Sequence, residues 1–378
     1  MTGVIERVTL THLQIPLKEP FRISAGEVAI KDAILVSLAT SDGEGVGESS
    51  PMAAGFGYST DTPEGCWDDL ADRIAPGLVG RSFATVEEIA DLAGSWSGSR
   101  FAVAGAETAC WDLLGHARHE SLAEMLGASG DAVLRGVDSG LAVGLYPTIV
   151  DLIQAIDTHM AEGYRRVKIK ITPGSDVDLV RAVRQHFGDV PLMVDANASY
   201  TIADLDVFRE LDGYDLLMFE QPMAADDLDG LAALQKVVTT PVCIDETAET
   251  PGEDARGDPT RACRIVNIKL QRGGVRPRAG DPRPLPREWG RLLGGDHARA
   301  GRRAAQGIHL AALANCKYPT DIEPGALVRR RLRDPAHRDG PARPPGRPDA
   351  AGLGYQVDPA KVRRYAVRHA EFTSKTVG

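Results

Sequence analysis

Short apolar segments recur about every 25 residues between positions 140 and 270, and a stretch with helical periodicity follows most of them. The segments are apolar almost throughout, which is typical of parallel strands that are covered on both faces. The six predicted strands are 140–144, 166–171, 191–195, 216–220, 241–245 and 264–270, and the predicted helices between them are 148–162, 177–187, 202–211 and 228–238. Six such repeats favour a closed (β/α) barrel over an open doubly wound sheet.

The first 130 residues have a different pattern. Strand-like segments at 8–15 and 33–39 are followed by a turn at Ser41-Asp42-Gly43, which predicts an antiparallel start. From 62 to about 126 the apolar residues recur with helical spacing. We therefore predict an α/β protein in which a smaller α+β unit precedes a barrel.

Composition excludes several functional classes. The formal net charge is −10, the wrong sign for a protein that binds nucleic acid by neutralising phosphates. No run of roughly 18 apolar residues could span a membrane, and residues 1–16 lack the features of a cleaved leader. The five cysteines are scattered without zinc-binding spacing, and no strand-to-helix turn carries a nucleotide-binding glycine motif. We expect a cytoplasmic protein that binds neither nucleic acid nor membrane.

Charged residues stand at the ends of five consecutive predicted strands. Two lysines share the first strand, a carboxylate ends each of the next three, and a lysine ends the last: Lys168, Lys170, Asp195, Glu220, Asp245 and Lys269. The carboxyl ends of barrel strands lie on one face, and that face holds the active site in barrels of this kind. We therefore expect these side chains to converge.

Three converging carboxylates have raised pKa values unless a cation compensates them. A set of oxygen ligands without His or Cys suits Mg²⁺ first and Mn²⁺ second. A lysine beside another cation binds its proton less tightly and becomes a usable base. The pattern thus predicts removal of the proton next to a metal-bound carboxylate, with the metal stabilising an enediolate. Asn197 and Glu246 either fix the ligand carboxylates or act as helix-cap and turn residues.

Five motifs make the chain resemble the muconate-lactonizing subgroup of the enolase superfamily. They are Lys168-Ile-Lys170, Asp195-Ala-Asn197, Glu220-Gln-Pro222, Asp245-Glu246 and Asn267-Ile-Lys269. The resemblance implies an α+β capping domain over a (β/α)7β TIM-like barrel and Mg²⁺ on the three carboxylates. It also implies acid/base roles for Lys170 and Lys269, while Lys168 orients the substrate carboxylate and depresses the pKa of Lys170.

On this resemblance we divide the chain into a capping domain (1–130), a barrel (131–355) and a C-terminal tail that packs back on the capping domain (356–378). Substrate choice is assigned to capping-domain loops at 24–28 and 50–62. The implied substrate is a small carboxylate and the implied assembly a homo-oligomer. The activity that the resemblance implies is racemisation of N-acylamino acids or o-succinylbenzoate-type dehydration; alternatives are muconate-type cycloisomerisation and dipeptide epimerisation.

Residues 271–350 depart from the repeat pattern. They contain 16 arginines and 11 prolines, and proline is incompatible with helix interiors. Two explanations stay open for 275–303 and 326–349: a shifted reading frame in a GC-rich gene, or a basic insertion that binds an acidic partner. A disrupted C-terminal third also leaves open a non-catalytic barrel.

Overall fold

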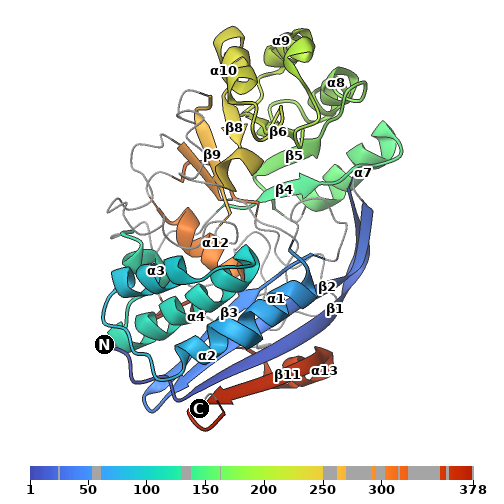
Figure 1. Ribbon diagram of the computed structural model, residues 1–378. Coiled ribbons are helices and arrows are strands. Elements are labelled where there is room, and N and C mark those ends of the chain that lie inside the picture. Colours follow the sequence, from blue (N-terminus) through green and yellow to red (C-terminus); the bar gives the residue numbers. More distant parts are fainter. Residues whose placement is uncertain are drawn as a thin grey trace.

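The computed structural model describes residues 1–23, 26–52, 61–128, 138–161, 163–249, 262–269, 291–294, 303–313, 316–321, 350–354 and 357–376. Figure 1 shows two parts, an antiparallel sheet with helices packed on it and a parallel sheet with helices on its outer side. In the described part of the chain, no helix is both long and apolar enough to cross a membrane.

The first part is built on a four-stranded sheet in the order β11-β1-β2-β3. Its strands are antiparallel and span Arg7–Ile23 (β1), Gly26–Thr40 (β2), Gly43–Ser49 (β3) and Ala366–Thr373 (β11). The predicted strands at 8–15 and 33–39 are confirmed, but both are longer than predicted. The extra length is a two-stranded ribbon in which Ile23 pairs with Gly26.

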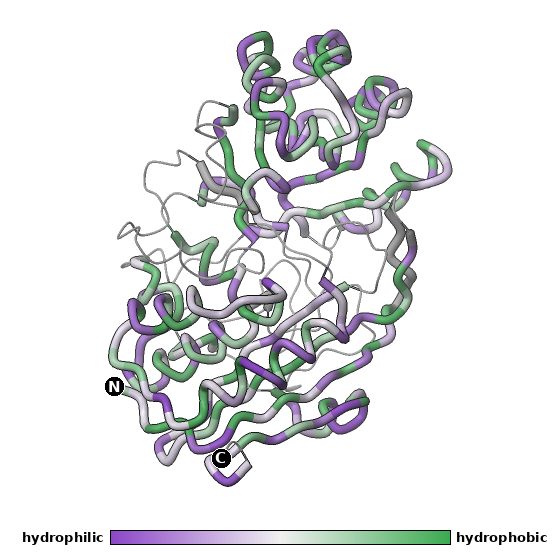
Figure 2. Tube along the Cα trace, in the orientation of Figure 1, coloured by the Kyte–Doolittle hydropathy of each residue, from purple (hydrophilic) through white to green (hydrophobic). Residues whose placement is uncertain are grey.

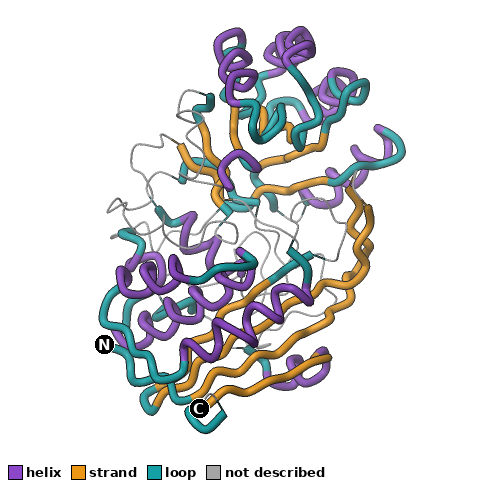
Figure 3. Tube along the Cα trace, in the orientation of Figure 1, coloured by secondary structure: helices purple, strands orange, loops and turns teal. Residues whose placement is uncertain are grey.

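Helices cover one face of this sheet, as Figure 3 shows by colour. They are α1 (Pro63–Asp69), the π-helix η1 (Leu70–Ile74), α2 (Ala75–Leu78), α3 (Val86–Ser95), α4 (Arg100–Arg118) and α5 (Leu122–Met125). α4 lies close against β3 because both carry glycine at the contact. A Cβ on Gly105 would meet the backbone nitrogen of Ser49 at 2.7 Å, and one on Gly47 would collide with the carbonyl oxygen of Gly105.

The second part is a parallel sheet in the order β10-β9-β8-β7-β6-β5-β4. Its first six strands are β4 (Gly140–Val143), β5 (Arg166–Lys170), β6 (Leu192–Asp195), β7 (Phe219–Glu220), β8 (Val242–Ile244) and β9 (Ile265–Ile268). Helices α7 (Ile149–Met160), α8 (Val177–Phe187), α9 (Leu205–Leu211) and α10 (Leu228–Val237) connect them. Short 3-10 turns stand at Ile202–Asp204 (η2), Asp212–Tyr214 (η3) and Glu246–Glu249 (η4). All six predicted strands and all four predicted helices are confirmed.

Side chains alternate between the two faces of this sheet, as strand geometry requires. Those facing the helices form one large apolar core, which includes Val194, Phe219, Ile244 and Val266. Their neighbours one position earlier form a separate cluster of Met193, Met218, Cys243 and Ile265. Hydrophilic and hydrophobic residues alternate along each outer helix, in keeping with one buried face each (Figure 2).

The arginine-rich region contributes to the sheet despite its composition. Arg291–Gly294 forms β10 and pairs in parallel with β9, so a seventh strand stands where the repeat pattern had broken. α12 follows at Arg303–Ala311. Thr320 then forms a parallel bridge with Ser139, next to β4, and occupies the eighth strand position. The other residues of 275–303 and all of 326–349 lie outside the described residues.

The chain returns to the first part at its end, through α13 (Pro359–Tyr365) and β11, which pairs with β1. Of the loops assigned to substrate choice, 24–25 and 53–60 also lie outside the described residues.

Candidate active site

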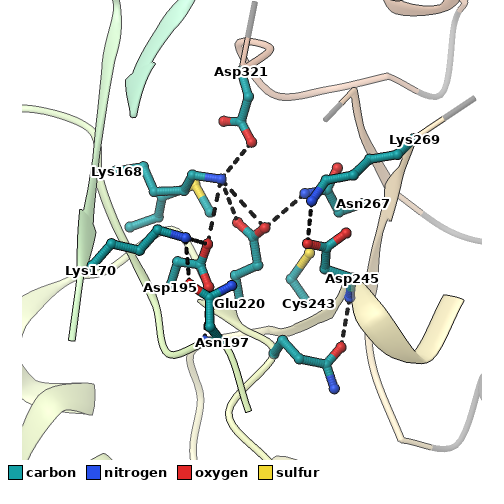
Figure 4. A network of polar contacts seen from close by, with 12 residues as sticks. Lys168, Lys170, Asp195, Asn197, Glu220, Cys243, Asp245, Asn267, Lys269 and Asp321 are labelled. Carbon is teal, nitrogen blue, oxygen red and sulfur yellow. Dashed lines mark hydrogen bonds and ion pairs between the residues drawn. The ribbon is translucent and has the colours of Figure 1, made fainter. Parts of the chain in front are cut away.

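Three predicted site residues form a row across neighbouring strands. Lys170 is the register partner of Asp195 on β6, and Asp195 is the register partner of Glu220 on β7. The strand ends therefore place these side chains next to one another on the inner face. Asp195 and Glu220 are buried, and Lys170 is partly buried. Figure 4 shows how they point toward one another.

Lys168 precedes Lys170 by two positions on β5, so its side chain lies on the same face of the sheet. It is 5% exposed. Its ammonium donates to Asp321 at 2.6 Å and to Glu220 at 3.1 Å, and lies 3.7 Å from Asp195. Burial alone would lower the pKa of Lys168, but Asp321, Glu220 and Asp195 outweigh it and hold that pKa well above its usual range. Lys168 is therefore a fixed cation in this site.

Lys170 donates to Asp195 at 2.6 Å and to the side-chain oxygen of Asn197 at 2.5 Å. The amide nitrogen of the Asn197 side chain donates to Glu246 at 3.1 Å, and its backbone nitrogen donates to Asp195 at 3.0 Å. Asn197 has a φ of 41°, a conformation that asparagine tolerates better than most residues. Lys170, Asn197 and Glu246 are thus linked in series by side-chain hydrogen bonds. Asn197 and Glu246 also lie in turns, so both alternatives given for them in the sequence analysis apply.

Lys269 approaches from the other side of the site. It is 9% exposed and donates to Asp245, which follows β8. The backbone nitrogen of Asp245 donates to the side chain of Gln221 at 2.8 Å, and the Gln221 amide also donates to Thr247 at 2.8 Å. Gln221 is completely buried and joins the ends of β7 and β8. The predicted site residues therefore lie together: Lys168, Lys170, Asp195, Asn197, Glu220, Asp245, Glu246 and Lys269.

The carboxylates differ in how easily they ionise. Burial and the neighbouring Asp195 raise the pKa of Glu220 to about 8, although Lys168 is close. Burial also acts to raise the pKa of Asp195, but Lys170 and Lys168 outweigh it and lower that pKa. Glu220 is thus the carboxyl group that lacks sufficient positive charge around it.

Asp195, Glu220 and Asp245 fit a hard divalent cation by their chemistry. All three offer carboxylate oxygens from adjacent strands, and the raised pKa of Glu220 reflects a need for positive charge that such an ion would meet. Each is paired with a lysine. In the described residues, no three His, Cys, Asp or Glu side chains are arranged to hold a metal as they stand.

Sequence reasoning missed Asp321, Arg166 and the role of Asn267. Arg166 precedes Lys168 by two positions, so its guanidinium points inward as well, where it bonds Asp321. A buried arginine on the same strand face as two lysines needs an acidic partner. Arg166 was therefore the sequence feature that could have pointed to a buried acid such as Asp321. Asn267, two positions before Lys269, is 1% exposed and donates to Glu220 at 2.8 Å.

Comparison with known proteins gives the family models and relatives that this chain matches. Residues 5–127 match the family model of the mandelate racemase / muconate lactonizing enzyme N-terminal domain, and residues 151–361 match that of the enolase C-terminal domain-like family. The chain is 37% identical over 366 residues to an o-succinylbenzoate synthase of Geobacillus stearothermophilus, with 96% of each chain covered. It is also 37% identical over 268 residues to an N-succinylamino acid racemase of Amycolatopsis sp., with 71% of this chain and 72% of the relative covered.

A solved structure extends the similarity to three dimensions. A member of the enolase superfamily from Listeria innocua superposes with a TM-score of 0.86 at 29% identity, and the match covers 98% of this chain and 99% of that chain. Because the match covers nearly all of both chains, the two proteins share the same overall fold.

Proposed function

Because the chain belongs to the mandelate racemase / muconate lactonizing enzyme family of the enolase superfamily, we propose that it removes the proton α to a substrate carboxylate. The observation that carries this proposal is the placement of Lys170 and Lys269 on opposite sides of one carboxylate cluster (Figure 4). Lysines on both sides of a substrate can remove a proton from one face and return one to the other.

Membership of this family suggests use of a divalent metal, and we assign Mg²⁺ to Asp195, Glu220 and Asp245, with Mn²⁺ as the substitute. When bound, the ion would supply positive charge that stabilises the negative charge that builds up on the substrate carboxylate. Asn267 donates to Glu220, which favours one orientation of that carboxylate. The side-chain oxygen of Gln221 accepts a hydrogen bond from the backbone nitrogen of Asp245, which holds the backbone in place there.

Each lysine has a separate task in this proposal. Lys170 and Lys269 are the two acid/base groups. Lys168, held as a cation by the carboxylates around it, orients the substrate carboxylate and disfavours a second positive charge on Lys170. Asn197 and Glu246 hold the Lys170 side chain in place.

The names of the relatives support two reactions on succinyl-bearing carboxylates. The names of the two relatives described above, an o-succinylbenzoate synthase and an N-succinylamino acid racemase, favour dehydration to o-succinylbenzoate or racemisation of N-acylamino acids. Both reactions begin with loss of an α-proton, so one site would serve either. Muconate-type cycloisomerisation and dipeptide epimerisation are the alternatives within the family.

Proton exchange in D₂O tests the proposal and chooses the reaction. Purified protein with Mg²⁺ is incubated with an N-succinylamino acid, a dipeptide, a muconate and the synthase substrate, and the α-proton is followed by NMR. We expect exchange or turnover in the N-succinylamino acid or synthase class, and its loss in EDTA. A folded protein that binds Mg²⁺ but neither exchanges an α-proton nor turns over a substrate of any class would support the non-catalytic barrel instead.

Assembly and location are separate proposals. We expect a homo-oligomer in the cytoplasm, which light scattering after gel filtration and cell fractionation would test.

A further inference from the structure

The eighth strand position of the barrel brings an acidic residue, Asp321, against the inner face of β5. Asp321 is 4% exposed, and its two carboxylate oxygens have different partners. One accepts from the guanidinium of Arg166 and the other accepts from the ammonium of Lys168 at 2.6 Å. One carboxylate therefore joins two cations that are themselves two positions apart on the same strand.

Arg166 is completely buried and holds the segment around Asp321 by its backbone as well. Its guanidinium donates to the carbonyl oxygens of Pro319 and Thr320, each at 3.2 Å, and to the sulfur of Met193 at 2.9 Å. These contacts use most of the N–H donors of the Arg166 guanidinium and fix its position. Arg166 in turn fixes the Asp321 carboxylate, whose other oxygen accepts from Lys168.

Gly140 on β4 makes room for this guanidinium. A Cβ at position 140 would collide with the terminal atoms of the Arg166 side chain. The backbone nitrogen of Gly140 donates to the Thr320 carbonyl at 2.6 Å, next to the bridge between Ser139 and Thr320. The same contact that places the eighth strand position against β4 therefore encloses the Arg166–Asp321 pair.

We propose, building on the function above, that Asp321 is a positioning residue that holds Lys168 in the site and is itself held by Arg166. Lys168 has three carboxylates around it, and two of them, Glu220 and Asp195, are the assigned metal ligands. Asp321 is the third and lies outside that ligand set. It gives Lys168 a partner that does not compete with metal binding.

The direct test measures Lys168 itself. Reductive methylation with formaldehyde and a borohydride is followed by digestion with an arginine-specific protease, which cuts after Arg166 and Arg181 and leaves Lys168 and Lys170 in one peptide whether or not they are methylated. Fragmentation of this peptide in the mass spectrometer reports the labelling of each lysine. In Asp321→Asn, labelling of Lys168 relative to Lys170 should rise at least tenfold, because the amide is uncharged and has one acceptor oxygen where the carboxylate has two, one for each cation. Gly140→Ala, which displaces the guanidinium without touching Lys168, should shift the ratio in the same direction.

Asp112→Asn is the matched control. Asp112 is also buried, accepts backbone bonds from Val46 and Leu353, and lies on α4 away from the site. Its replacement should leave the labelling ratio within twofold. An unchanged ratio in both Asp321→Asn and Gly140→Ala, or an equal rise in Asp112→Asn, would overturn the assignment.

Kinetics separates this proposal from the proposed function. If the wild-type protein exchanges α-protons, Asp321→Asn should lower kcat/KM at least tenfold and Asp112→Asn less than twofold. Equal activity of wild type and Asp321→Asn contradicts the positioning role. If the wild-type protein neither exchanges α-protons nor turns over a substrate, the proposed function fails, and the labelling ratio still decides the role of Asp321.

Discussion

Lys170 and Asp195 are register partners on adjacent strands, and their side chains are joined at 2.6 Å. Backbone pairing and side-chain pairing thus coincide at the centre of the site. Lys269 has a corresponding relationship with Asp245 on the far side. Each of the two lysines is therefore held by its own carboxylate, Lys170 by Asp195 and Lys269 by Asp245. Each lysine can be replaced without removing the partner of the other, so its contribution to proton transfer can be measured separately.

Replacement of one lysine should remove proton transfer on one face of the substrate only. We expect Lys170→Ala to lose α-proton exchange from one enantiomer of the substrate and Lys269→Ala to lose it from the other, each by at least ~100-fold. Racemisation should be abolished in both. NMR of each pure enantiomer in D₂O measures this. Lys236→Ala, an exposed lysine on α10, should behave as wild type, and full activity in both site variants would contradict the two-base assignment.

Removal of the Glu220 charge should weaken metal binding. Glu220→Gln keeps the shape of the side chain but leaves only two carboxylates for the cation. The affinity of the protein for Mn²⁺ should therefore fall at least ~10-fold. Titration followed by electron paramagnetic resonance measures this affinity. EDTA should stop α-proton exchange in the wild-type protein and Mg²⁺ should restore it. Glu107→Gln serves as a control, because Glu107 is equally buried but accepts from Trp111 on α4. Equal Mn²⁺ affinity of Glu220→Gln and wild type would rule Glu220 out as a ligand.

Asp212 should give the barrel a pH-dependent stability. Burial acts to raise the pKa of Asp212, but hydrogen bonds from Thr239 and Thr240 outweigh it and lower that pKa below 3.8. A carboxylate with a lowered pKa in the folded state stabilises at higher pH, and this stabilisation is lost as the pH falls through that pKa. Asp212→Ala should therefore cost about 1–3 kcal/mol at pH 7 and progressively less below about pH 4.

Urea unfolding of wild type and variant across this pH range measures the difference. Asp206→Asn is the control, since the Asp206 side chain is 92% exposed and pairs only with Arg209 among the described contacts. A cost of Asp212→Ala that does not change with pH would show that the lost bonds do not depend on the ionised carboxylate.

The contact between β3 and α4 should tolerate no added methyl group. Gly47→Ala would force a Cβ into the backbone of α4 at Gly105 and Ala109, so we expect it to destabilise the protein by about 1–3 kcal/mol. Gly43→Ala lies on the same strand with nothing within 4 Å of the added Cβ, and should change stability little. Chemical unfolding followed by circular dichroism compares the two. Equal stability of both variants would mean that α4 can move away from β3 at little cost.

The repeat of strands and helices could be predicted because each strand is apolar on both faces and each helix on one. The site residues followed from the same repeat, since a charged residue at the end of an apolar strand stands out. Asp321 could not be found in this way, because it follows a stretch where the repeat is lost, and its partner Arg166 lies at the start of a strand rather than at its end. The long ribbon of β1 and β2 was also missed, because residues 17–23 lack apolar alternation, and residues 21–23 belong to the strand through their pairing with β2.

The pairing of β11 with β1 has a consequence for biosynthesis. Arg7 pairs with Thr373, so the sheet of the first part gains its fourth strand from a segment that the ribosome makes more than 350 residues later. Until then β1 presents an open edge to the surroundings, and such edges promote association with other chains. The sheet of the first part therefore reaches its final form only after the barrel sequence has been made.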